Sequence, residues 1–441
     1  MNFDYNDFAC TRDFFPRYFN NLWSVDRDSY LMVERKCNKK GDMASSALEA
    51  IMQRLPKKFF FKMNSAQLDA ITYSEYVFPT YRFILPDALM DDWLAIIDPH
   101  KKHCRDHSLH QPLTAYIVAK LLGYGDPAKA FELKSGDLLT TCAKIMITST
   151  KTEYLKDYFR SLYPDYVRIP QNIHLKLARD IFYETAVVSA LFHDIGYPWM
   201  YINRLNESIL AVDFRLTADK MVQSKGILDM IENRLLIYPF YGYSKIGKNH
   251  PISTWQEKIL MLFDKSLRQT HGFPGSLAFT HLQDKTRVFP ADTSFNEAVC
   301  RFIYDWAAVG IMMHDMPKIY KDKGRTPENP FLRVSFDTDP LSCLIATADI
   351  LEEFHRPAAN FSQDIKDVES IKVNYGYPCK QTKLELKGDL LEVSYVYSNA
   401  ALAAKNKRFR ISEIDDYFNP KQGFVNVAPL GIKAVTCNCI I

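Results

Sequence analysis

The chain has 441 residues, 47% of them hydrophobic and 24% charged, which is typical of a globular protein and excludes global disorder. Its 55 lysines and arginines nearly balance 52 aspartates and glutamates, so the net charge of +3 does not favour a nuclease or another nucleic-acid partner. The nine cysteines form no Cys-x-x-Cys pair, which argues against disulfides and a cysteine zinc site and favours a reducing, cytoplasmic location. No apolar stretch has the length of a membrane span, so we expect no membrane partner.

Three regions follow one another along the chain. Residues 1–95 are rich in aromatic side chains, and their mixed patterning, which includes a helical spacing over residues 44–55, predicts a mainly helical N-terminal region. Between residues 96 and 357, apolar residues recur at helical spacing in segments broken by proline and glycine, which predicts an all-helical core domain. These predicted helical segments are residues 113–122, 173–192, 254–267, 296–313 and 341–354.

The remaining region, residues 358–441, changes character. Residues 382–386 and 391–397 alternate apolar with polar side chains around a Lys-Gly-Asp turn, which predicts a β-hairpin. Residues 400–404 predict a helix, and the basic residues that follow it form either an ordinary solvated face or a phosphate contact. We therefore expect a mainly α protein, with an all-helical core and a small α/β appendage at its C-terminal end.

His193 and Asp194 stand side by side after an apolar run. Consecutive residues lie about 100° apart around a helix axis, so both side chains can reach one metal ion only near a helix end. Gly196 and Pro198 predict such an end directly after the pair. By itself the pair fits either a metal-binding step at the end of a buried helix or a capping carboxylate beside a hydrogen-bonded histidine.

Further histidines and a buried carboxylate accompany this pair. His107 and His110 precede or begin a buried helix, His271 follows a polar stretch, and His314 ends the apolar run of residues 302–313. Asp349 lies at the centre of an apolar helix, where a carboxylate is costly unless a positive group or a cation faces it. Imidazole nitrogens combined with carboxylate oxygens suit transition-metal ions, so the set points to a metal-dependent hydrolytic site.

The order of these residues resembles that of the HD superfamily of metal-dependent phosphohydrolases. The similarity covers roughly residues 96–357 and implies an all-helical fold with the metal site among its helices. Four segments look like the family's successive motifs: residues 106–111, 191–196, 270–272 and 346–357. His193, Asp194 and Asp349 match the defining pair and the final aspartate. His110 is preferred over His107 as the first histidine, because small and apolar residues follow it at the family's helix spacing.

The resemblance also implies the cofactors and their ligands. Two divalent ions, manganese, iron, cobalt or zinc, would share Asp194 as a bridge. One ion would take His110, His193 and Asp349, and the other would take His271 and His314.

A chemical role follows for several residues. The resemblance implies that a metal-bound hydroxide cleaves a phosphate ester or anhydride of a nucleotide, with Asp194 and His107 as catalytic residues and His107 as proton donor. The candidate phosphate contacts are Lys318, Arg333 and Arg356. The substrate class stays open between a deoxynucleoside triphosphate (a dNTPase), a nucleoside monophosphate and a cyclic nucleotide (a phosphodiesterase).

The sequence also departs from the family. Tyr197 stands where many relatives carry lysine or histidine, which puts a phosphate contact there in doubt, and His355 stands where relatives often carry glycine. We expect Glu352 and Glu353 to face solvent or to pair with a base. His281 lies ten positions after His271 and is the remaining histidine that could return to the same pocket.

A second class of function remains open. The helical domain could instead be a nucleotide-sensing or partner-binding regulatory protein whose metal site holds the fold together. Tight nucleotide binding without hydrolysis would distinguish it from an enzyme. A homo-oligomer is compatible with the sequence in either case.

Overall fold

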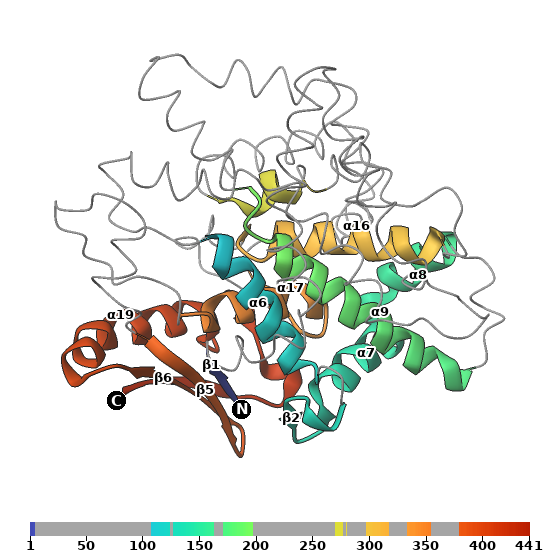
Figure 1. Cartoon of the computed structure of the whole chain (residues 1–441). Coiled ribbons are helices and arrows are strands. Elements are labelled where there is room, and N and C mark those ends of the chain that lie inside the picture. The colour runs from blue at the N-terminus through green and yellow to red at the C-terminus, as the bar shows by residue number, and fades with distance from the viewer. Residues whose placement is uncertain are drawn as a thin grey trace, which may run out of the picture.

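The computed structural model describes residues 1–4, 107–123, 127–162, 171–196, 270–276, 279, 297–316, 333–353 and 379–441. This part of the chain is mainly α-helical and carries a small β-sheet, as the sequence predicts (Figure 1). The predicted helices at residues 44–55 and 254–267 lie outside the described residues.

The helical body is arranged around one buried helix. Helix α9 (Gln171–Phe192) contacts four other helices, which are α6 (His107–Leu121), α7 (Leu138–Thr148), α16 (Glu297–Met313) and α17 (Pro340–Leu351). Helix α8 (Glu153–Leu162) packs against α7 and α16. Residues 185–195, in the C-terminal half of α9 and the turn after it, are buried without interruption, as expected for a helical segment enclosed by others, whereas Lys176 near its start is exposed.

Four of the predicted helical segments are confirmed. Residues 113–122, 173–192 and 296–313 correspond closely to α6, α9 and α16, and residues 341–354 correspond to α17. Helix α17 begins at Pro340, where the Asp339 side chain accepts a hydrogen bond from the Ser342 amide at 3.0 Å. It ends at Leu351 rather than at residue 354, because Glu352 has an extended backbone (φ −80°, ψ 99°).

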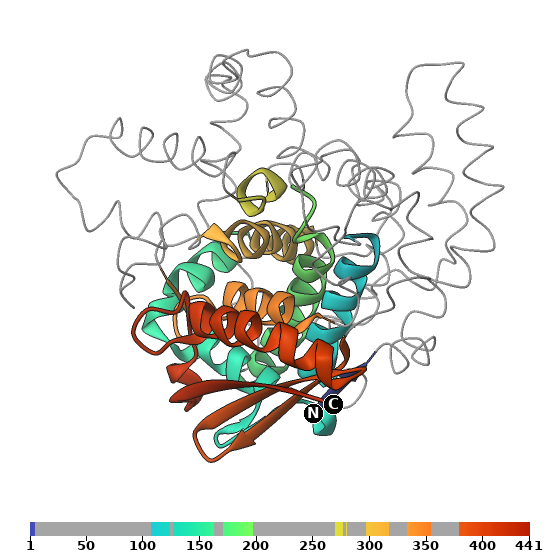
Figure 2. The ribbon, with the colours of Figure 1, turned by 90° about the vertical axis from the view of Figure 1, so that its left-hand side faces the viewer.

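A four-stranded sheet lies against one side of the helical body, as two views show (Figures 1 and 2). Its strand order is β1-β5-β6-β8. These strands are β1 (Asn2–Asp4), β5 (Cys379–Lys387), β6 (Leu390–Tyr397) and β8 (Ala434–Ile440). Strands β5 and β6 form the predicted antiparallel hairpin, with Gly388 at φ +67° in its turn, where a residue without Cβ is favoured.

The rest of the sheet was not expected from the sequence. Strand β1, from the start of the chain, pairs antiparallel with β5, and β8 pairs parallel with β6. The connection from β6 to β8 contains helix α19 (Ala400–Phe418), which packs on β8 and β6. The shorter elements are β2 (Glu132–Leu133), β3 (Gly136–Asp137), β4 (Val334–Ser335), β7 (Val425–Asn426), η3 (Pro127–Lys129), η4 (Thr150–Thr152) and η8 (Ala428–Leu430).

Among the helices that the structure describes, none combines the length and the apolar character needed to cross a membrane.

Candidate metal centre

Helices α9 and α16 end in two matching His-Asp turns. In each turn the histidine Nδ1 lies 2.7 Å from the backbone oxygen three residues earlier, His193 from Ala190 and His314 from Ile311. A carbonyl oxygen only accepts hydrogen bonds, so Nδ1 is the donor in both rings. In the neutral form of each ring, Nε2 therefore keeps its lone pair free to bind a cation.

Four buried histidines bring their Nε2 atoms together. The Nε2 atoms of His110 and His193 are 3.3 Å apart, and those of His271 and His314 are 3.0 Å apart. The His193 and His314 rings join the two pairs, with their centroids 5.2 Å apart. Two nitrogen ligands that each lie about 2.1 Å from one metal ion are separated by roughly 3.0–3.4 Å in octahedral or tetrahedral geometry. The observed separations therefore fit a metal coordination shell.

The Asp194 carboxylate lies between the two histidine pairs. Its Oδ1 is 2.7 Å from His271 Nε2 and 3.3 Å from His193 Nε2, and its Oδ2 is 3.6 Å from His110 Nε2. Oδ1 thus lies near one histidine of each pair, whereas Oδ2 faces His110 of the first pair. The carboxylate could therefore contact a cation held at either histidine pair.

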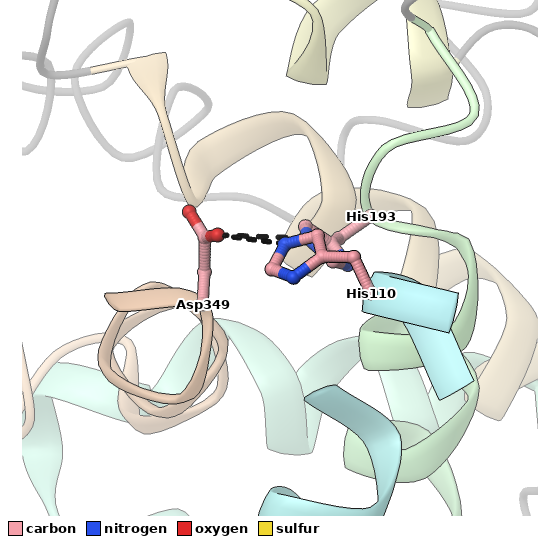
Figure 3. Close-up of side chains that lie close together, drawn as sticks. All are labelled: His110, His193 and Asp349. Carbon is pink, nitrogen blue, oxygen red and sulfur yellow. Dashed lines mark hydrogen bonds and ion pairs between the residues drawn. The ribbon is translucent and has the colours of Figure 1, made fainter. Parts of the chain in front are cut away.

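Asp349 reaches the first histidine pair from helix α17 (Figure 3). Its Oδ1 lies 3.1 Å from His110 Nε2 and 3.8 Å from His193 Nε2. The sequence predicts a positive group or a cation opposite this carboxylate, and the two imidazoles supply basic nitrogens there. A cation among these three ligands would offset the cost of burying Asp349.

The described residues contain three groups of side chains whose ligand atoms all lie within 4.8 Å of one another, so that each group could hold a metal ion. The members of every group are buried. The groups are His110, His193 and Asp349; His193, Asp194 and His314; and His271, His314 and Asp315. Adjacent groups share a histidine, which places the potential sites next to one another.

Burial keeps His314 in the form that binds metals. Removal from solvent, assisted by the neighbouring His271 and His193, lowers the pKa of His314 to about 4, against the opposing effect of Asp315 and Asp349. The imidazole is therefore neutral at pH 7. A neutral ring can bind a cation without first losing a proton.

Glu352 is a site residue that the sequence did not identify. It is fully buried, and its Oε2 lies 2.5 Å from His110 Nδ1, which donates to it. A carboxylate behind a histidine fixes the ring and increases its basicity toward a metal ion. The expectation that Glu352 and Glu353 face solvent is wrong, since both are buried, whereas the alternative of a basic partner is confirmed by His110 and, for Glu353, by Arg410.

Asp315 positions His271, one of the two histidines of the second pair. Its Oδ2 accepts a hydrogen bond from the His271 amide at 2.9 Å and lies 3.1 Å from His271 Nδ1. Its Oδ1 accepts from the Gly272 amide at 3.2 Å, at the start of the helical residues 272–276. Asp315 therefore caps this segment and holds the His271 ring with Nε2 toward Asp194.

The contact between Glu352 and His110 predicts a loss of metal affinity on substitution. In the Glu352→Gln variant, a neutral amide would face His110 Nδ1, and we expect the affinity for Mn²⁺ or Co²⁺ to fall about 10- to 100-fold. The exposed Glu385→Gln on β5 is the control. Isothermal titration of both variants measures the difference, and equal affinities would rule out the orienting role of Glu352.

The described residues do not include the side chains of most of the other predicted site residues. His107 is the first residue of α6, and its side chain is not described; Lys318, Arg356, Tyr197, His281 and His355 lie outside the described residues. Arg333 is buried and donates to the backbone oxygens of Pro420 at 2.9 Å and Asn419 at 3.3 Å. These bonds anchor the chain after α19, so we do not place Arg333 among the phosphate ligands proposed below.

A scan against protein-family models, a search of curated proteins and a search of solved structures each returned no significant match to this chain. The buried histidine and aspartate groups are compatible with an HD-type site.

Proposed function

We propose that this chain is an HD-type metal-dependent phosphohydrolase that acts on a nucleotide. The observation that carries the proposal is the position of Asp194, whose two oxygens face two buried histidine pairs. Two divalent cations bound there would act as Lewis acids toward a phosphate group and activate water at neutral pH.

The residues present fit two such ions. His110, His193 and Asp349 would hold one, His271 and His314 the other, and Asp194 would bridge them. Mixed nitrogen and oxygen ligands suit manganese, iron, cobalt or zinc, whereas magnesium and calcium favour sites made of oxygen alone. Glu352 and Asp315 would hold the rings of His110 and His271 in register with the ions.

Residues beside the cluster would donate a proton to the leaving group and contact the phosphate. His107 begins α6 three residues before His110, a spacing that places both residues on the same side of the helix. We assign it the role of proton donor to the leaving oxygen. Lys318 and Arg356 follow the later motifs closely in the sequence, and we keep them as the candidate phosphate contacts.

The test combines metal analysis with a substrate panel. Purified protein is expected to contain about two transition-metal ions per chain. In the presence of Mn²⁺, Fe²⁺ or Co²⁺, it is then offered deoxynucleoside triphosphates, nucleoside monophosphates and cyclic dinucleotides. Release of triphosphate, inorganic phosphate or a linear dinucleotide identifies the substrate class. Tight nucleotide binding with no turnover of any member would overturn the enzymatic proposal and support the sensor.

A further inference from the structure

The end of helix α17 carries two groups of the metal centre. Asp349, in its last turn, approaches His110 Nε2, and Glu352, directly after the helix, accepts from Nδ1 of the same ring. The two carboxylates thus hold the ring of His110 at both nitrogens. Any displacement of this helix end would change both contacts together.

The C-terminal sheet binds the backbone at this end of α17. The last carbonyl groups of a helix have no partner within it and must be satisfied from outside. The Tyr395 hydroxyl donates to the Ile350 oxygen at 2.8 Å, and the Thr382 hydroxyl donates to the Leu351 oxygen at 2.9 Å. Both side chains are fully buried, and the two residues are direct cross-strand partners on β6 and β5. A single cross-strand pair of the sheet therefore hydrogen-bonds the backbone oxygens of two consecutive residues, directly after Asp349.

Helix α19 adds a third contact. Arg410 is buried and forms an ion pair with Glu353, the residue after Glu352, and a second pair with Glu413 on its own helix. Its guanidinium lies 5.6 Å from the centre of the Tyr395 ring. The sheet and α19 thus contact residues 350, 351 and 353, which lie before and after Glu352 in the chain.

We propose that the C-terminal α/β unit, residues 379–441, is a positioning part of the metal centre rather than an independent appendage. Thr382, Tyr395 and Arg410 are its positioning residues, because they hold the end of α17 where Asp349 and Glu352 meet His110. The proposal rests on the metal-dependent function proposed above. Because coupling between two sites is reciprocal, bound metal should also strengthen the docking of this unit.

Two tyrosines on the same strand provide a matched test in the full-length protein. Tyr395 and Tyr397 are both buried on β6, and the hydroxyl that donates to the end of α17 is that of Tyr395. Phenylalanine keeps either ring and removes only the hydroxyl. We expect Tyr395→Phe to weaken Mn²⁺ and Co²⁺ binding about three- to tenfold, the effect of one hydrogen bond, and Tyr397→Phe to leave it within about twofold. Adding Thr382→Val to Tyr395→Phe should increase the loss.

The visible spectrum of the Co²⁺-loaded protein gives a second measurement, because it reports the geometry around the ion. It should change in Tyr395→Phe and not in Tyr397→Phe. Substitutions of two arginines, one buried and one exposed, extend the test to α19. Arg410→Met should weaken Co²⁺ binding and Arg410→Lys should restore part of it, whereas Arg408→Met, on the exposed side, should match the wild type.

The outcomes separate the two proposals. If the wild-type chain binds neither Mn²⁺ nor Co²⁺, the metal centre and the proposed function both fail. If the wild type binds metal and Tyr395→Phe equals Tyr397→Phe in affinity and spectrum, the positioning proposal fails while the proposed function stands. A lower melting temperature for Tyr395→Phe with unchanged affinity would likewise reduce its role to packing.

Discussion

Asp194→Asn is expected to remove both metal binding and hydrolysis. Asparagine has nearly the same shape, but it lacks the negative charge and the second carboxylate oxygen that would let Asp194 face His271 with one oxygen and His110 with the other. Metals contribute several kcal/mol to such reactions, and each 1.36 kcal/mol is a factor of ten in rate, so kcat/KM should fall at least about a thousandfold. Metal content measured by elemental analysis should fall with it.

The matched control is Asp157→Asn. Asp157 is an exposed aspartate on α8, and its side chain is 64% accessible. This variant should keep the metal content and activity of the wild type. Turnover at the wild-type rate by a metal-free Asp194→Asn protein would contradict the mechanism.

Gly196→Ala is expected to separate the two halves of the centre. A Cβ at Gly196 would overlap the backbone carbonyl oxygen of His271 and would stand 2.6 Å from the Gly275 amide nitrogen. Backbone atoms cannot rotate away, so the turn that carries Asp194 must move from the segment that carries His271. The 2.7 Å approach of Asp194 Oδ1 to His271 Nε2 depends on that contact. We expect the second ion to be lost first, with metal content near one per chain, and the free energy of unfolding to fall by about 1–3 kcal/mol.

A second glycine variant distinguishes this local effect from general destabilisation. Gly388→Ala places a Cβ at φ +67° in the β5–β6 turn, where no atom lies within 4 Å, so only backbone strain of about 1–2 kcal/mol is added. It should lower the melting temperature and leave the metal content unchanged. Equal metal content in the Gly196→Ala and wild-type proteins would show that the turn does not need this close approach.

Local patterns in the sequence predict much of the helical body. The apolar spacing of residues 173–192 and 296–313 identifies α9 and α16 almost to their ends, because a buried helix repeats its pattern over many turns. The alternation in residues 382–397 identifies the β5–β6 hairpin for the same reason. Strand β1 was not predicted, because it has only three residues and its partner residues, 381–383 of β5, are far away in the sequence.

Some residues of the candidate site could be predicted from the sequence, and others could not. Asp349 stands out in the sequence because a carboxylate in an apolar helix is costly without a partner. His193 and Asp194 stand out because they lie between an apolar run and a Gly-Tyr-Pro stop. Glu352 does not stand out, since nothing near it in the chain requires burial. Its partner His110 lies 242 residues away, and only packing of α6 against α17 brings the two together.

The helix-rich class, the hairpin and the candidate ligand residues could be predicted from the sequence, because these depend on residue chemistry and on spacing over a few turns. Three features depend on the packing of distant segments: the carboxylate that lies between the histidine pairs, the side chains that orient the rings, and the contacts of the C-terminal sheet with the end of α17. Gly196 illustrates the difference. In sequence it marks the end of a helix, whereas in the fold it is the place where two backbones meet too closely for any side chain. Such contacts join segments that are distant in sequence, and therefore no local pattern records them.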